Sequence, residues 1–161
     1  MENKNIQFKN ATIDDIKALL DIEQRCFTKY YKAHRFTQQQ FVYYIRNPLA
    51  ITFIATQNGH VIGYVLGLTQ RGRLRHIARL YSIATLPGTR RTGVSRHLLS
   101  LFLKSAKKRG AKQVILEVAE KNTAARKLFT LSGFHETDTM LDYYGKGTSG
   151  IRMAQYLGRA K

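Results

Sequence analysis

The residues best suited to chemistry gather in a short basic turn between two regular patterns of the chain. Residues 80–86 are apolar and alternate like a half-buried strand, and a helical pattern begins directly after Gly93. The first amide groups of a helix have no partner within it and carry positive potential, which suits a phosphate. Arg90, Arg91 and Arg96 add mobile positive charge around the same point. The turn is therefore predicted to hold a pyrophosphate.

Two common nucleotide motifs, the P-loop and the G-x-G-x-x-G fingerprint, do not occur in this turn. It reads Arg90-x-x-Gly93-x-Ser95, which resembles the Q/R-x-x-G-x-G/A signature of the GCN5-related N-acetyltransferases (GNAT). A strand with L-E-V, an N-x-x-A-x-x-L-F segment and S-G-F follow in that order. The order resembles the ribosomal-protein-alanine (RimI-type) branch. The resemblance is tight over residues 80–134 and looser on both flanks.

This resemblance implies acetyl-CoA as co-substrate and a set of residues that bind it. The backbone of Ile83, Ala84 and Thr85 would pair with the pantetheine, and an N–H at or beside Ala84 would face the oxyanion. Ser95 replaces the usual Gly or Ala, which keeps the N–H but adds a crowding Oγ. Asn122 would cap the next helix and touch the cofactor. The residues around the pyrophosphate would be Arg90, Arg91, Thr92, Gly93, Val94, Ser95 and Arg96.

Glu117 is the candidate general base. It interrupts the apolar strand V-I-L-E-V and is one of two acids in residues 71–127. By resemblance it matches the catalytic glutamate of the L-E-V motif and would take the ammonium proton, directly or through water. The alternative is a glutamate on the solvent face of a strand. Glu120 is a second candidate, although it falls at the strand end.

Phe129 departs from the family pattern. Its position usually holds a tyrosine that protonates the departing thiolate, and phenylalanine has no proton to give. Phe129 would still contact the cofactor. A thiol with a pKa near 8.5 is a tolerable leaving group, so the change need not abolish activity. Tyr143 or Tyr144, in a loop that by resemblance lines the acceptor site, would replace the missing donor; packing is the alternative for both.

Other kinds of site find no support in the sequence. The five histidines show no metal-ligand spacing, and a single cysteine makes a zinc site improbable, so no metal is expected. Cys26 lies on an amphipathic pattern and is expected to pack in the core. Tyr30, Tyr31 and Phe36 form an aromatic segment that either contacts the acceptor or lies on the surface.

The charge is strongly positive and unevenly placed. The 161 residues carry a net charge of +17, of which residues 71–127 supply +13. Such a field attracts polyanions, namely the cofactor and weakly RNA or a ribosome, and repels a polycationic acceptor such as a polyamine. A solvated surface is the alternative. The apolar runs are too short to span a membrane and the N-terminus has no apolar signal region, so a cytoplasmic protein, monomeric or weakly dimeric, is expected.

The elements that position these residues can be read from periodicity and caps. We expect strands at residues 6–11, 51–56, 61–68, 80–86, 113–118, 134–141 and 151–157, and residues 71–79 to open as a basic loop and run into the central strand. Helices are expected from Thr12, from Thr37 to 45, at 94–108 and from Asn122 to 132, and residues 29–35 as a loop. This order resembles the GNAT acyl-CoA N-acyltransferase fold, an α/β (α+β) domain over residues 1–161. Its mixed, mostly antiparallel sheet has six to seven strands flanked by about four helices.

The leading hypothesis is an acetyl-CoA-dependent N-acetyltransferase that transfers the acetyl group directly to the N-terminal amine of a protein or peptide, ribosomal-protein-like. A second hypothesis keeps the chemistry and takes a small-molecule amine, anionic or neutral, as acceptor. A third is a non-catalytic module that binds acetyl-CoA or RNA, to which the departures at Ser95 and Phe129 point.

Overall fold

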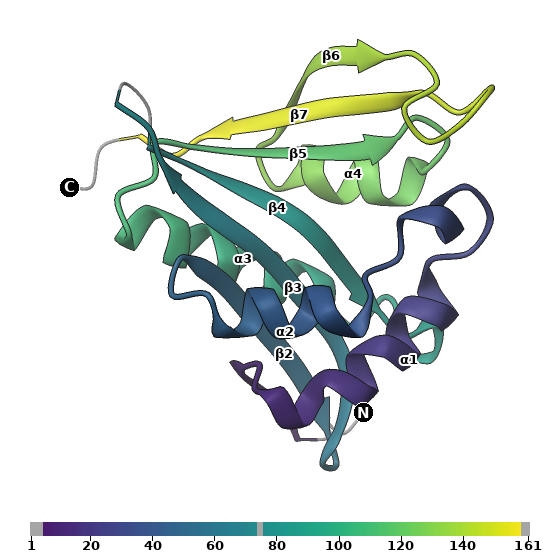
Figure 1. Ribbon diagram of the computed structural model, residues 1–161, viewed down its shortest axis with the longest axis vertical. Helices are drawn as coiled ribbons and strands as arrows, with labels where there is room; N and C mark the ends of the chain where they lie inside the picture. Colours follow the sequence, from purple (N-terminus) through teal and green to yellow (C-terminus); the bar gives the residue numbers. More distant parts are fainter. Residues whose placement is uncertain (1–4, 74–75, 159–161) are drawn as a thin grey trace.

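A single twisted sheet of seven strands organises the computed structural model, which describes residues 5–73 and 76–158 (Figure 1). The strand order is β1-β2-β3-β4-β5-β7-β6, and β4 with β5 is the parallel pair in an otherwise antiparallel sheet. The strands are β1 (Ile6–Asn10), β2 (Ala50–Gln57), β3 (His60–Arg71), β4 (His76–Thr85), β5 (Gln113–Ala119), β6 (His135–Met140) and β7 (Gly150–Tyr156).

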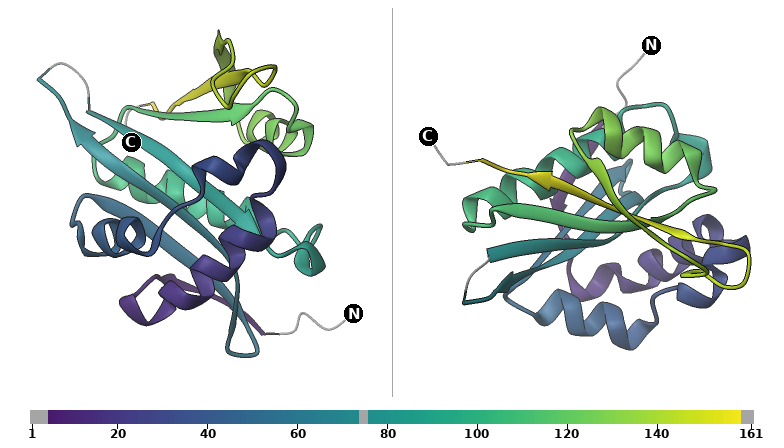
Figure 2. Two further views of the ribbon diagram at one scale, coloured as in Figure 1. Left: turned by 45° about the vertical axis from the view of Figure 1, so that its right-hand side comes forward. Right: turned by 90° about the horizontal axis from the view of Figure 1, so that it is seen from above.

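Helices cover both faces of the sheet. Figure 2 shows α1 (Ile16–Cys26) and α2 (Gln38–Arg46) on one face, and α3 (Val94–Lys108) and α4 (Thr123–Leu131) on the other. Each face of the sheet therefore has its own apolar layer. Among the helices of the described chain, none is long and apolar enough to cross a membrane.

The predicted fold class is confirmed, and the helix signals explain why. At α2 the Thr37 hydroxyl accepts from Gln40 N at 3.2 Å, while Thr37 N donates to the Gln40 side chain at 2.8 Å. This reciprocal capping box satisfies two amides that a helix start leaves free. Asn122 caps α4 in the same sense, accepting from Ala125 N at 3.2 Å. The expected bounds of α3, residues 94–108, are those observed.

One expectation about a loop was wrong, and one strand begins earlier than expected. The segment expected as a loop at residues 29–35 contains a 3-10 helix, Lys29–His34, whose aromatic side chains pack against one another. Residues 71–79 run into the central strand as expected, but the strand starts sooner, because β3 continues to Arg71 and β4 already begins at His76. Long β3–β4 pairing, from Gly63 opposite Thr85 to Arg71 opposite His76, outweighs the polarity of these residues. Leu74 and Arg75 lie outside the described residues.

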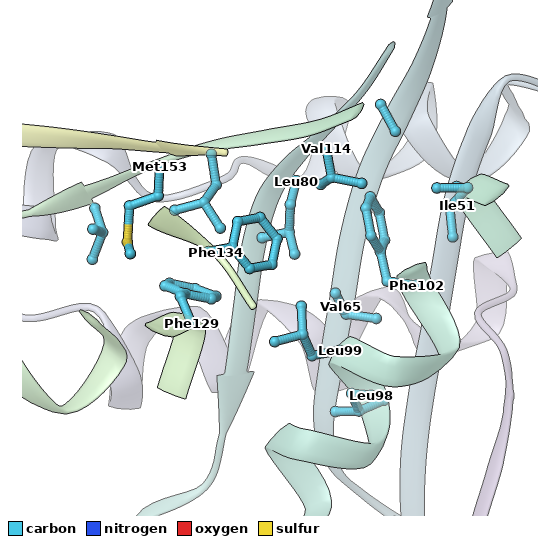
Figure 3. Packing of buried hydrophobic residues seen from close by; sticks show 14 of the residues in the cluster. Ile51, Val65, Leu80, Leu98, Leu99, Phe102, Val114, Phe129, Phe134 and Met153 are labelled. Atoms are coloured by element: carbon cyan, nitrogen blue, oxygen red, sulfur yellow. The ribbon is translucent and has the colours of Figure 1, made fainter. Parts of the chain in front are cut away.

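The core consists of two apolar clusters, one on each face of the sheet. The larger one joins α3 and α4 to the sheet, and Figure 3 shows Phe102, Leu99, Phe129, Phe134 and Met153 meeting there. The smaller one lies under α1 and α2. Helix α3 approaches β3 very closely at one glycine. A Cβ built on Gly67 would lie 2.2 Å from Arg79 O and 2.5 Å from the Phe102 ring.

Candidate active site

The site begins where two neighbouring strands of the sheet separate. The parallel pairing of β4 with β5 joins Ile77–Arg79 to Gln113–Ile115, and beyond it the strands diverge, as Figure 1 shows. The register of β4 against β3 also shifts here, so that Tyr81 is an extra residue between Leu80 and Ser82. Bulges of this kind bend a strand and end its pairing. The later part of β4 is left with a backbone edge facing a gap.

A pocket, here called the central pocket, fills this gap. Its walls come from β4, β5, α4, the connection between α1 and α2, and the β6–β7 loop. The lining residues are Glu23, Phe27, Tyr31, His34, Phe36, Leu80, Tyr81, Ser82, Ile83, Glu117, Val118, Asn122, Ala125, Phe129 and Tyr144. Of the three β4 residues expected to face the pantetheine, Ile83 lines this pocket, Ala84 is buried under α1 and α2, and Thr85 lies toward α3.

Glu117 lies in the central pocket and is held by two arginines. Its side chain is 11% exposed, and Oε1 accepts from Arg79 Nη2 and from Arg152 Nε, the latter at 3.3 Å. The alternative to a catalytic role, a glutamate on the solvent face of a strand, does not describe this arrangement. Within the described residues, Oε2 has no hydrogen-bond donor. One carboxylate oxygen is thus fixed, and the other can accept a proton from a ligand.

The predicted phosphate turn forms a second pocket at the N-terminus of α3. Residues 90–96, here called the α3 mouth, line it together with Thr85, Thr89 and Leu128. Positive φ angles of 65° at Arg91 and 83° at Gly93 turn successive amides toward one side, and such nests bind anions. Glycine adopts this conformation without strain. The amides and arginines of the α3 mouth fit a pyrophosphate chemically.

Ser95, the unusual residue of the α3 mouth, is accommodated by a hydroxyl partner. Its Oγ lies 3.1 Å from Thr85 Oγ1 at the end of β4. The extra atom therefore has a hydrogen bond that ties α3 to β4. Cys26 contacts the same strand end, with Sγ donating to Thr85 O at 3.3 Å, so its thiol is half-buried between α1 and β4.

Asn122 connects α4 to the aromatic segment between α1 and α2. Besides capping α4, its Nδ2 donates to Tyr31 Oη at 3.0 Å, and Ala119 N donates to the same oxygen at 3.0 Å. Tyr31 is therefore fixed against the end of β5 and the start of α4. It also packs edge-to-face on Tyr144, with ring centroids 5.1 Å apart. The aromatic segment is part of the site wall.

Phe129 and the two tyrosines that could replace its missing hydroxyl differ in their exposure and in whether they line the central pocket. Phe129 is 3% exposed and packs in the core beside Phe134 while also closing one side of the central pocket (Figure 3). Tyr144 lines the pocket, and burial, followed by the nearby Tyr31, raises the pKa of its hydroxyl. Tyr143 is 46% exposed and is not among the lining residues. Geometry therefore favours Tyr144 over Tyr143.

A buried carboxylate that sequence reasoning missed forms part of the same pocket. Glu23 on α1 is 2% exposed and accepts from Phe36 N at 2.8 Å and from Tyr64 Oη. Tyr64 Oη lies 2.6 Å from Ser82 Oγ on β4. Burial raises the pKa of Glu23, while its hydrogen bonds act in the opposite direction. The chain of contacts fixes the aromatic segment to β4.

The comparisons with known proteins agree with this architecture. The model of the acetyltransferase (GNAT) family matches residues 16–134. An N-alpha-acetyltransferase of Sulfurisphaera tokodaii is 27% identical over 95% of this chain and 94% of its own length. A [ribosomal protein bS18]-alanine N-acetyltransferase of Haemophilus influenzae is 33% identical over 63% of this chain and 68% of its own.

A solved structure shows the same fold over the whole chain. The ribosomal-protein-S18-alanine N-acetyltransferase of Escherichia coli has a TM-score of 0.80 and 27% identity, covering 98% of this chain and 97% of that one. The family model spans most of the residues, including the α3 mouth and Glu117. The chain therefore belongs to the GNAT acetyltransferase family, with similarity to its RimI-type branch, and is an acetyl-CoA-dependent N-acetyltransferase.

Proposed function

We propose that the chain acetylates the N-terminal amine of a protein or peptide, with Glu117 as the base that takes the ammonium proton. The observation that carries the proposal is the arrangement around Glu117. Glu117 lines the central pocket, its Oε1 is fixed by two guanidinium groups, and its Oε2 accepts no hydrogen bond from the described residues. Relatives named for N-alpha-acetylation and for ribosomal-protein-alanine acetylation support this acceptor class.

The residues divide the reaction between two pockets. The α3 mouth would hold the pyrophosphate of acetyl-CoA, and the free edge of β4 at Ile83, Ala84 and Thr85 would pair with its pantetheine arm. Bound acetyl-CoA supplies an activated acetyl group. Glu117, directly or through one water, would deprotonate the acceptor amine, and Tyr144 would return a proton to the leaving sulfur. Most of the rate enhancement would come from positioning.

The aromatic wall supports a peptide acceptor. Tyr31, Phe36 and Tyr144 come from two connections of the chain and line the central pocket, where the end of a peptide would contact them. The alternative acceptor, a small anionic or neutral amine, would use the same base. The third reading, a non-catalytic module, loses its support because the family consists of acetyltransferases.

The Glu117→Gln variant tests the role of the base. We expect turnover to fall about 100- to 10,000-fold, as is typical for a lost general base, while acetyl-CoA binding measured by calorimetry stays near the wild-type value. Unchanged turnover with a good acceptor would remove Glu117 from the mechanism. The acceptor class is tested by a turnover screen of peptides with free and blocked N-termini beside small amines.

A further inference from the structure

The two arginines that hold Glu117 carry together one more positive charge than the glutamate neutralises. Arg79 on β4 and Arg152 on β7 both contact a single oxygen of one carboxylate, and Arg152 stands directly opposite Glu117 in the β5–β7 register. Two cations therefore contact one anion, Glu117, which lines the central pocket, and the arginines lie behind it, outside the set of lining residues. The group as a whole is positive by one charge.

Most of the hydrogen-bonding capacity of these arginines is unused. A guanidinium has five N–H donors, and within the described residues each of these two makes one hydrogen bond. The side chains are 26% exposed for Arg79 and 38% exposed for Arg152, against 11% for Glu117. The free donors thus face solvent beside the base rather than the core.

Among the described residues, no carboxylate other than that of Glu117 forms an ion pair with Arg79 or Arg152. Asp138 on β6 stands opposite Arg152 in register, yet the two form no ion pair. Glu23, the other carboxylate of the central pocket, is buried against Tyr64 and Phe36. A negatively charged group of the acceptor would neutralise the remaining positive charge of Arg79 and Arg152.

A strip of tyrosines continues from the arginines over the α2 side of the sheet. Tyr81 lies two residues after Arg79 on β4 and is 36% exposed. Burial raises the pKa of its hydroxyl, Arg79 lowers it and Glu117 raises it, so both charged groups lie near the ring. Its ring lies 5.4 Å from that of Tyr44, which lies 5.2 Å from that of Tyr43. Tyr43 is 60% exposed, so the strip runs outward from the pocket. Aromatic rings with polar tips suit contact with a peptide chain.

We propose that the enzyme selects acceptor peptides with an acidic side chain within their first three residues. The free N–H groups of Arg79 and Arg152 bind that carboxylate, and the residues that follow lie along Tyr81, Tyr44 and Tyr43. The inference rests on the proposed function, because it requires a peptide acceptor whose amine reaches Glu117. An extended peptide covers about 3.3–3.6 Å per residue, so the first three residues lie within reach of both arginines.

Matched peptides provide the test. Peptides of ten residues that differ only by Glu, Gln or Lys at position 2 or 3 are compared by kcat/KM with acetyl-CoA. We expect the Glu peptide to exceed the Gln peptide about tenfold or more, as for hydrogen bonds to charged groups, and the Lys peptide to be the poorest. Equal values for the three peptides would overturn the inference while leaving N-terminal acetylation intact.

Variants of Arg152 separate selection from catalysis. Because Arg152 also touches Glu117, its loss changes the rate with every peptide, whereas only a direct contact changes the Glu-to-Gln ratio. We expect Arg152→Gln to bring that ratio close to one and Arg152→Lys to keep part of it. Arg73→Gln, in the exposed turn between β3 and β4, is the matched control and should leave the ratio unchanged. An unchanged ratio in Arg152→Gln would contradict the proposal.

A binding measurement completes the design. The acetylated Glu peptide, labelled for fluorescence anisotropy, should bind the wild type more tightly than Arg152→Gln, without any turnover. The Tyr43→Ala variant should lower the affinity for ten-residue peptides about threefold, within the range measured for single aromatic contacts. Its affinity for three-residue peptides should be unchanged. If small amines were acetylated and no peptide were, the proposed function itself would fail, and this inference with it.

Discussion

At the residue scale, Glu117 works within a group of three side chains and not alone. Arg79 and Arg152 fix one of its oxygens, so the direction of the second oxygen is set by the sheet itself. A base that must accept a proton at one place benefits from such restraint, because little side-chain freedom is lost when the acceptor binds. Phe129, in turn, cannot protonate the leaving sulfur, so a neighbouring tyrosine has to supply that proton.

Tyr144 is expected to meet that demand. Burial raises the pKa of its hydroxyl, so the group keeps its proton through the neutral and mildly alkaline range, which is the form that a proton donor needs. We expect Tyr144→Phe to lower kcat about 100-fold, the low end for a general acid, because a thiol leaves easily. Introducing Phe129→Tyr into that variant should restore part of the rate. Steady-state kinetics of Tyr144→Phe, of Tyr144→Phe combined with Phe129→Tyr, and of Tyr143→Phe check the assignment. It would be refuted if Tyr143→Phe lowered kcat and Tyr144→Phe did not.

Glu23 makes stability depend on pH. A carboxyl whose pKa is raised by burial binds its proton more tightly in the folded than in the unfolded state. Its contribution to stability is therefore complete below the ordinary pKa near 4.5 and is lost as the pH rises through the folded-state value. We expect the free energy of unfolding of the wild type, relative to Glu23→Gln, to fall as the pH rises above about 4.5. Denaturant titrations of both proteins across that range check this, and a constant difference would contradict it.

At the scale of elements, the α3 mouth depends on one residue that only glycine fills well. Gly93 has a φ of 83° and is the N-cap of α3, so it sets the direction of the first helical amides. Non-glycine residues in this conformation cost about 1–2 kcal/mol. The cost appears either as lost stability or as a relaxed turn that no longer presents its amides together.

Gly93→Ala should therefore weaken the binding of acetyl-CoA, although the substitution adds only one methyl group. We expect the dissociation constant, measured by calorimetry at low salt, to rise about tenfold, corresponding to the strain above. Gly88→Ala is the control, because Gly88 precedes the same turn, has no positive φ, and a Cβ there would meet no atom within 4 Å. Equal effects of the two substitutions would show that the turn does not depend on this conformation.

At the scale of the whole molecule, two groups of basic residues lie at opposite ends of α3. Residues 71–112 contain 12 basic and no acidic side chains. Arg90, Arg91 and Arg96 surround the α3 mouth, while Lys107, Lys108, Arg109 and Lys112 follow at the other end, where Lys112 N donates to His76 O at 2.8 Å. A helix of this length separates its ends by about 20 Å. The second group is too far away to hold the cofactor.

This second group is expected to attract RNA weakly. The triple variant Lys107→Gln, Lys108→Gln, Lys112→Gln should lower the affinity for a single-stranded RNA oligonucleotide and flatten its salt dependence, without changing acetyl-CoA binding. Lys9→Gln, Lys17→Gln, Lys32→Gln removes the same charge from exposed positions elsewhere and is the matched control. Anisotropy at several salt concentrations gives the comparison. Equal losses for both triple variants would point to net charge alone.

The sequence by itself determined the features that depend on neighbouring residues. Periodicity and end signals placed α3 at residues 94–108 and put Asn122 at the start of α4, because a helix is specified by its own side chains and caps. The order of elements and the L-E-V strand also identified the family. Gly93 was recognisable for the same reason, because the positive φ of this turn favours glycine independently of the residues that pack around the turn.

Only the tertiary structure decided which distant side chains meet. Arg79 and Arg152 are 38 and 35 residues from Glu117, and Tyr31 is 91 residues from Asn122. The insertion of β7 between β5 and β6, and the divergence of β4 from β5, bring them together. Such contacts leave no local pattern, because the free energy that selects them comes from packing the whole sheet between two helical layers.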